Sequence, residues 1–233
     1  MIFGLFSYDW TILLVLPGLI VSIWAQIKVT STFRKYSKTS TLRGLTGYGA
    51  ARKILDENGL SHIRIEQIGG ELSDHYDPKA NVIRLSAAVY SSSSPASIGV
   101  AAHEAGHAIQ YARHYAPIKL RAGLVSITQF SSMLAMPLFF IGLLFASEVL
   151  MLLGIVLYSA IAFFQLVTLP VEFDASARAM KVLASSGTLT NDELKAARKV
   201  LTAAAMTYVA ALLTSLLTLL RLLVLAGGRN RRR

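Results

Sequence analysis

The sequence predicts a mostly α-helical integral membrane protein with about four membrane helices and an α+β domain that holds a small β-sheet. Three observations support this fold class: several long apolar stretches, two short segments in which apolar and polar residues alternate, and a His-Glu-x-x-His pattern at residues 103–107. A membrane helix needs about 20 apolar residues, and alternation is typical of half-buried strands.

The composition agrees with a membrane protein. Hydrophobic residues make up 54% of the 233 residues and charged residues 15%, whereas about 25% charged is usual in soluble domains. The formal net charge of +10 favours an anionic partner, which in so apolar a chain is the lipid bilayer. We expect no nucleic-acid partner, because neither a nucleic-acid motif nor a pattern of stacking aromatics is present. The absence of cysteine excludes disulfides and thiolate metal sites.

Residues 1–28 are predicted to form an N-terminal transmembrane anchor. Residues 10–27 are mostly apolar and carry no charge. A secretory signal peptide begins with basic residues, which residues 1–27 lack, so we expect a retained span in a multi-pass protein of the cell membrane. By the positive-inside rule, the basic residues that follow place the next domain in the cytoplasm. They are Lys28, Arg34, Lys35, Lys38 and Arg43.

Residues 29–121 are predicted to form a cytoplasmic α+β domain. A helix is expected over residues 45–58, which show helical spacing. Residues 62–68 and 81–85 alternate as strands do, and the second strand could offer a backbone edge to an extended peptide.

A second helix of this domain carries the His-Glu-x-x-His pattern. Ser94 and Pro95 supply an N-cap and a first-turn proline, which predict a helix over residues 95–115. Pro117 is expected to mark its end.

Residues 122–169 are predicted to form a transmembrane hairpin, with two apolar stretches joined by a tight turn at Ser147 and Glu148. The first stretch is unusually polar. Its polar side chains either form hydrogen bonds between helices or line a hydrated helix face that leads towards the His-Glu-x-x-His pattern. They are Ser126, Thr128, Gln129, Ser131 and Ser132.

The last two predicted segments are cytoplasmic helices over residues 170–200 and a C-terminal membrane helix with a basic tail over residues 201–233. A new helix is expected after Pro170, and Thr190 with Glu193 forms a capping box for the next one. If the final apolar run crosses the membrane, it carries the last five arginines outside. The alternative is a helix that lies along the membrane surface.

The chemistry centres on His103, Glu104 and His107. Residues four apart lie on one face of a helix, so the two histidines can point at one metal ion. Glu104 projects beside them, where it can take a proton from water. In a chain without cysteine, this pattern predicts one Zn²⁺ per chain, held by histidine and carboxylate ligands, with Glu104 as the catalytic base.

The third metal ligand has several candidates. His114 lies about 10 Å beyond His107 along a continuous helix, which is too far to share the ion. Glu172 is the better candidate, because it is expected to open a helix where the hairpin returns to the cytoplasmic boundary. Two histidines in strand or turn sequence remain open, His62 and His75.

Four runs of sequence together resemble one known family: GVAAHEAGHAIQ, LPVEFDASARA, SDHYDPKANVIRLS and LTGYGAARKILDENGL. Over nearly its whole length the chain is similar to the neutral zinc metallopeptidases of bacterial membranes (the YugP-like family). It is more distantly similar to the heat-shock and prenyl-protein membrane proteases. The resemblance implies a zincin-like catalytic domain and a gluzincin-type site, with His103, His107 and Glu172 as zinc ligands and Glu104 as base.

The same resemblance leaves open which residue orients a metal ligand through a hydrogen bond without itself contacting the metal. The more distant families have Asp four residues after the ligand glutamate, whereas this chain has Ser176 at that position and Asp174 two residues earlier. We therefore expect either Asp174 or Ser176 to take this role.

The function that these observations favour is a zinc-dependent endopeptidase that acts on a protein or peptide at the cytoplasmic membrane surface. An oligomer is compatible with the sequence. Candidate donors to the oxyanion of the reaction are His75, Tyr76 and His114. The alternatives are a non-enzymatic membrane protein with a closed structural metal site, and a basic module that binds lipid.

Overall fold

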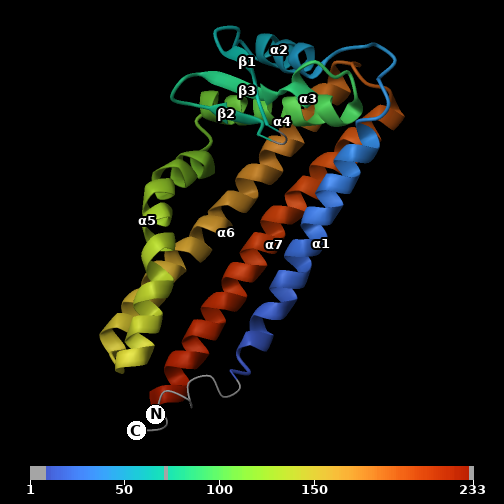
Figure 1. Cartoon of the computed structure of the whole chain (residues 1–233). Helices are drawn as coiled ribbons and strands as arrows, with labels where there is room; N and C mark the ends of the chain where they lie inside the picture. Colours follow the sequence, from blue (N-terminus) through green and yellow to red (C-terminus); the bar gives the residue numbers. More distant parts are fainter. Residues whose placement is uncertain (1–8, 71–72, 231–233) are drawn as a thin grey trace. The chain divides into compact units, whose positions relative to one another are not determined.

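The computed structural model describes residues 9–70 and 73–230 (Figure 1). The described part is mostly helical, as predicted, with one three-stranded sheet. The chain divides into two compact units. The first consists of Met1–Ala25, Leu120–Leu169 and Thr207–Arg233, and the second of Gln26–Lys119 and Pro170–Met206.

Four long helices dominate the structure. Within the described residues, these four are long and apolar enough to cross a membrane, which agrees with the predicted number of membrane helices. They are α1 (Ile12–Tyr36), α5 (Ala116–Phe145), α6 (Glu148–Ser185) and α7 (Asn191–Asn230).

Two predicted helix boundaries in this set are wrong. Helix α6 runs without a break through Pro170, so no new helix begins there and Glu172 lies inside a long helix. Proline removes one backbone hydrogen bond, but membrane helices tolerate it when neighbouring groups satisfy the freed carbonyl. Pro117 does not end the preceding helix; it lies in the first turn of α5, where a proline costs no hydrogen bond.

The first unit packs through small residues. A Cβ atom on Gly154 of α6 would lie 2.7 Å from the Cβ of Phe139 on α5, so only glycine permits this approach. Phe139 is fully buried and clusters with Met151 of α6 and Leu222 of α7. Close contact at small residues is the usual way in which membrane helices associate.

Three of the five uncharged polar side chains of α5 do not form the hydrogen bonds between helices that one of the two interpretations predicted. The hydroxyl of Ser132 donates to the carbonyl of Gln129 in its own helix. In the part of the chain that the structure describes, the buried hydroxyls of Thr128 and Ser131 have no hydrogen-bond partner. For these three residues, hydrogen bonding between helices is therefore wrong.

The sheet of the second unit has the strand order β1-β3-β2. Strands β1 (Arg64–Ile68) and β3 (Val82–Ser86) run parallel, and β2 (His75–Asp77) pairs antiparallel with β3. The expectation that residues 81–85 offer a free backbone edge is wrong, because β3 is the central strand and pairs on both sides. The edges of the sheet are β1 and β2.

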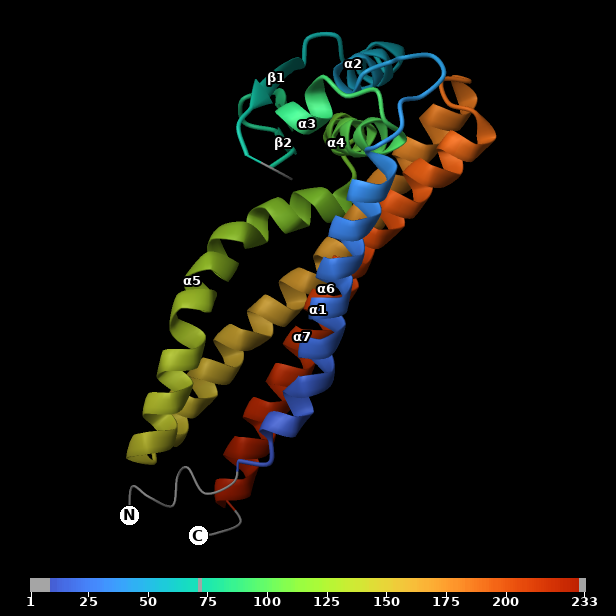
Figure 2. The same ribbon diagram turned by 45° about the vertical axis from the view of Figure 1, so that its right-hand side comes forward.

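Helices α2 (Gly47–Glu57), α3 (Ala87–Tyr90) and α4 (Pro95–Ala112) also belong to the second unit; they lie beside the sheet (Figure 2). The core between them includes Leu55, Ile83 and Ile98, all fully buried or nearly so. The hydroxyl of Ser94 accepts from the Ser97 N–H at 3.1 Å, which confirms the predicted N-cap of α4. The helix ends at Ala112, three residues earlier than predicted.

The α6 and α7 ends of this unit also follow local signals. Helix α6 ends at Ser185, and Gly187 adopts a φ of 58°, a left-handed conformation that glycine takes without strain. The Glu193 carboxylate accepts from the Thr190 N–H at 2.7 Å, and the Thr190 hydroxyl accepts from the Glu193 N–H at 3.3 Å. These two bonds confirm the predicted capping box.

Candidate metal centre

The His-Glu-x-x-His pattern lies on the central part of α4. His103 and His107 follow one another on one helix face, with ring centroids 4.7 Å apart and planes at 81°. His107 is buried and His103 is partly buried. The two Nε2 atoms point at the same carboxylate, that of Glu172 on α6.

A contact between two small residues brings this carboxylate close. A Cβ atom on Gly106 of α4 would lie 2.5 Å from the carbonyl oxygen of Ala175 on α6. Ala175 is fully buried, and so, nearly, is Ala179 one turn later. The absence of larger side chains lets the two helices approach until Glu172 reaches the histidines.

The geometry of the three side chains fits a zinc ion. The Glu172 Oε2 atom lies 3.2 Å from His103 Nε2 and 3.5 Å from His107 Nε2, and the candidate ligand atoms all lie within 4.8 Å of one another. Zinc bonds of about 2.0–2.2 Å in a tetrahedron place neighbouring ligand atoms about 3.3 Å apart. Glu172 is only 2% exposed, and a buried carboxylate is stable when a cation or hydrogen bonds compensate its charge.

The second ring nitrogen of His103 is held by Ser176. The Ser176 hydroxyl on α6 lies 3.1 Å from His103 Nδ1. A partner at this nitrogen fixes the orientation and tautomer of a metal-binding histidine. Ser176 is one of the two residues that the sequence left open for this role.

The second ring nitrogen of His107 is held by Gln110, which the sequence analysis did not select. The Gln110 Oε1 atom lies 3.0 Å from His107 Nδ1, so the amide oxygen accepts from the ring. The amide nitrogen of Gln110 donates to the carbonyl of Val171 and to the carboxylate of Asp174, both at 2.8 Å. Asp174, the other open candidate, therefore reaches the site through Gln110.

Asp174 extends this chain of contacts to the surface of α6. Its carboxylate accepts a hydrogen bond from the Arg178 Nε, one turn further along the helix. The Arg178 guanidinium lies over the ring of Tyr115 at 5.6 Å. The charge of Asp174 is thus compensated on one side while its oxygen holds Gln110 on the other.

Two carboxylates, those of Glu104 and Glu172, lie near the two histidines and favour the protonated form of His107. Burial lowers the pKa of His107, but the Glu172 carboxylate that it contacts, together with the charge of Glu104, raises that pKa above its ordinary value. Glu104 is 8% exposed, and its carboxylate has no hydrogen-bond or ion-pair partner among residues 9–70 and 73–230.

The remaining candidates lie in other parts of the second unit. His75 and Tyr76 belong to strand β2; His75 contacts the carbonyl of Ser73 at 2.8 Å, and the Tyr76 ring packs edge-on against Tyr111 of α4. His114 is exposed, with a φ of 52°, in the turn after α4. His62 is also exposed. In the described part of the chain, the group that could hold a metal is His103, His107 and Glu172.

Comparison with known proteins identifies a family of zinc peptidases. The model of the family described as "Putative neutral zinc metallopeptidase" matches residues 11–227. The chain is 48% identical over 220 residues to "Putative membrane protease YugP" of Bacillus subtilis (strain 168), a match that covers 94% of this chain and 98% of that protein. No solved structure matches the chain. The similarity spans both units and all three candidate ligands.

Proposed function

Because the chain belongs to the neutral zinc metallopeptidase family, we propose that it is a zinc-dependent endopeptidase of the cell membrane, with a gluzincin-type site on a zincin-like domain. The donor set supports this proposal most directly: one carboxylate oxygen meets two histidine Nε2 atoms at 3.2 and 3.5 Å. His103, His107 and Glu172 would hold the ion.

Glu104 is the proposed general base. It directly follows His103 in the sequence, and its carboxylate has no hydrogen-bond or ion-pair partner in the described structure. It can therefore take a proton from the attacking water and pass it to the leaving amine. When bound, zinc supplies Lewis acidity, which lowers the pKa of water towards 7 and polarises a carbonyl. Gln110 and Ser176 keep both imidazoles oriented towards the ion.

The substrate is proposed to be a protein or peptide that approaches along the sheet. Strand β2 lies at the sheet edge, and its Tyr76 packs against Tyr111, one turn beyond His107 on α4. An edge strand can pair with an extended peptide through its backbone. The oxyanion donor remains a prediction among His75, Tyr76 and His114.

The test of this mechanism is Glu104→Gln, which keeps the size of the side chain and removes the base. The variant should bind zinc as the parent does and lose peptidase activity by a factor of about 100 to 10,000. Zinc content and cleavage of casein would be measured on the same detergent-solubilised preparations. The matched control is Glu57→Gln, an exposed glutamate on α2, which should change neither. Full activity in Glu104→Gln would contradict the mechanism.

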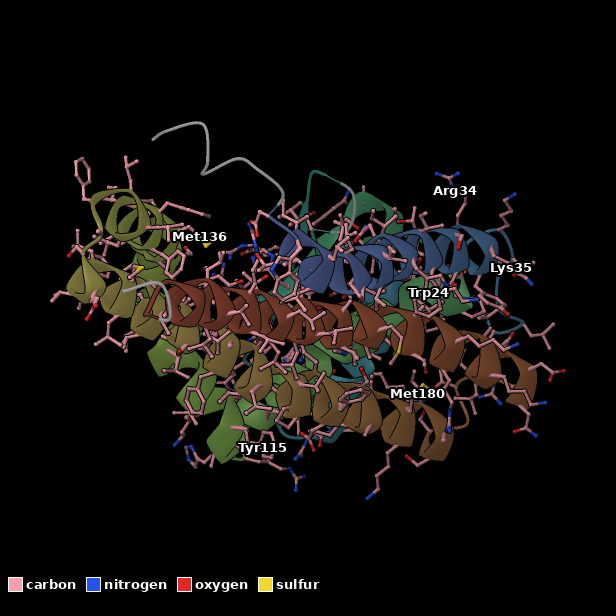
Figure 3. All side chains as sticks on the ribbon, turned by 90° about the horizontal axis from the view of Figure 1, so that it is seen from below. Trp24, Arg34, Lys35, Tyr115, Met136 and Met180 are labelled. Atoms are coloured by element: carbon pink, nitrogen blue, oxygen red, sulfur yellow. The ribbon has the colours of Figure 1, made fainter. Side chains whose placement is uncertain are left out.

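The catalytic unit is proposed to face the cytoplasm. Arg34 and Lys35 lie in the last turn of α1 and extend away from the helix in Figure 3, as the positive-inside rule expects of a cytoplasmic helix end. Since the chain has no cysteine, single cysteines report topology cleanly. Ser61→Cys should resist a membrane-impermeant thiol reagent in intact cells, and Gly228→Cys should react. The opposite pattern would reverse the orientation.

A further inference from the structure

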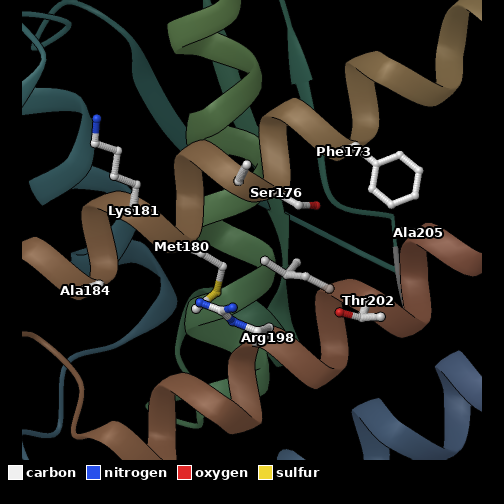
Figure 4. Close-up of a pocket in the computed structure, with 10 residues that line it drawn as sticks. Phe173, Ser176, Met180, Lys181, Ala184, Arg198, Thr202 and Ala205 are labelled. Atoms are coloured by element: carbon white, nitrogen blue, oxygen red, sulfur yellow. The ribbon is translucent and has the colours of Figure 1, made fainter.

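An open groove runs between α6 and α7 in the second unit (Figure 4). Its volume is about 470 Å³, within the usual range of ligand pockets. Met180 of α6 and Arg198 of α7 reach into the space between the helices in this view. The lining residues are Phe173, Ser176, Ala177, Met180, Lys181, Ala184, Arg198, Leu201, Thr202 and Ala205.

The charge of the groove is purely positive. Lys181 and Arg198 line it, no carboxylate does, and neither cation forms an ion pair with another described residue. Neighbouring cations differ in this respect: Arg178 pairs with Asp174, and Lys195 pairs with Asp192. In Figure 4 the Lys181 ammonium points away from α7 and Arg198, so its flexible stem must turn before it can reach an anion held by Arg198.

The rest of the groove is apolar. It lies where the sequences of α6 and α7 change between polar and apolar residues. Phe173 is 43% exposed, and Met180, Leu201 and Ala205 continue the apolar lining. The apolar run of α7 begins at Leu201, and the polar part of the same helix precedes it. A groove with cations at the polar end of two candidate membrane helices matches the two halves of a phospholipid.

The position of Ser176 argues against the scissile peptide as occupant. Ser176 lines the groove and contacts His103 through Nδ1, whereas His103 faces Glu172 through Nε2. The two nitrogens lie on different sides of the imidazole ring, so the groove lies behind His103 as seen from the metal ligands. A molecule in the groove would contact the support of His103 and not the reacting atoms.

We propose that this groove binds an anionic phospholipid, with its phosphate on Arg198 and Lys181 and an acyl chain along Phe173, Met180 and Leu201. This site is separate from the peptidase site, and its occupancy does not require that the proposed catalysis be correct. The lipid would pack against Ser176 and so stabilise the position of His103.

The test uses the full chain in detergent, with lipid binding followed by native mass spectrometry. Phosphatidylglycerol should bind and phosphatidylcholine should not. Replacing both cations, Lys181→Gln with Arg198→Gln, should weaken phosphatidylglycerol binding about 25-fold, roughly five-fold for each cation lost. The control pair Lys195→Gln with Lys199→Gln removes the same charge from exposed positions outside the groove. It should change lipid binding less than about two-fold, because a cation that contacts the phosphate contributes about five-fold and these two do not contact it.

Two further arms separate a lipid from other occupants. Ala177→Trp fills the groove from an exposed position without removing charge, and it should weaken phosphatidylglycerol binding at least as much as the double variant does. Inorganic phosphate should not displace the lipid, because it lacks the acyl chain. Equal binding of both lipids, an equal effect of the control pair, displacement by free phosphate or displacement by a peptide substrate would each overturn the proposal.

Discussion

The two histidines of the metal centre meet the same carboxylate but are supported in different ways. On the His107 side, Gln110 is fully buried and contacts His107, the carbonyl of Val171 and the carboxylate of Asp174. On the His103 side, a single hydroxyl, that of Ser176, contacts the ring, and Ser176 lines an open groove.

This difference indicates that one proposed ligand is fixed by the fold and the other is adjustable. Gln110 can make its contacts only when α4 and α6 are correctly packed, so the orientation of His107 depends on the protein interior. The support of His103 lies beside a space that a ligand or water can enter. Changes on the two sides of the site should therefore differ in size.

The largest effect is expected where the two sides meet. Glu172→Ala removes the oxygen that faces both histidines. Zinc affinity should therefore fall by more than about 100-fold, the upper limit for substitutions of residues that only hydrogen-bond to a metal ligand. Zinc affinity would be measured by competition with a chromophoric chelator. His62→Ala and His114→Ala alter exposed histidines and should retain the metal. If one of them releases zinc while Glu172→Ala holds it, the ligand set is wrong.

The next largest effect should come from the helix contact that serves both sides. Gly106→Ala places a Cβ atom 2.5 Å from the Ala175 carbonyl, and overpacking of this kind costs about 1–3 kcal/mol of stability. Both histidine supports lie across this contact, so thermal stability and zinc affinity should fall together. Gly99→Ala is the matched control on α4, because its Cβ would lie 3.4 Å from the Ala197 methyl carbon. An equal loss in both variants would contradict the role of the close approach.

Breaking the His107 side alone should have an intermediate effect. Gln110→Ala leaves His107 Nδ1 without its acceptor inside a buried region, so zinc affinity should fall about 100-fold, the upper end of the range for such partners. Asp174→Ala leaves Gln110 its bond to the Val171 carbonyl, so its effect should be near 10-fold. A larger loss in Asp174→Ala than in Gln110→Ala would contradict the order of contacts.

The parts of the site that the sequence predicted are those with local or family signals. The spacing of His103 and His107 follows from helix geometry alone. Glu172 was favoured both by its expected position after the hairpin and by a resemblance. Gln110 could not be selected, although it lies three residues after His107 on the same helix face. Its significance depends on Val171 and Asp174, which the packing of α4 against α6 brings near.

The fold shows the same limit. Caps such as Ser94 and the Thr190–Glu193 box depend only on residues within one helical turn of each other, and they were predicted correctly. The central position of β3 depends on pairing with strands on both sides, and the continuity of α6 through Pro170 depends on what surrounds the helix. Neither has a local signal, and both expectations were wrong.

The smallest effect is expected on the His103 side. Ser176→Ala removes the hydroxyl that contacts His103 Nδ1, but the position borders the groove, where water can take its place as a partner. Zinc affinity should fall about 10-fold or less, the lower end of the range, and thermal stability should hardly change. Ser176→Thr keeps a hydroxyl and should restore most of the affinity. If Ser176→Ala weakens zinc binding more than Gln110→Ala does, the fixed and adjustable sides of the site have been assigned the wrong way round.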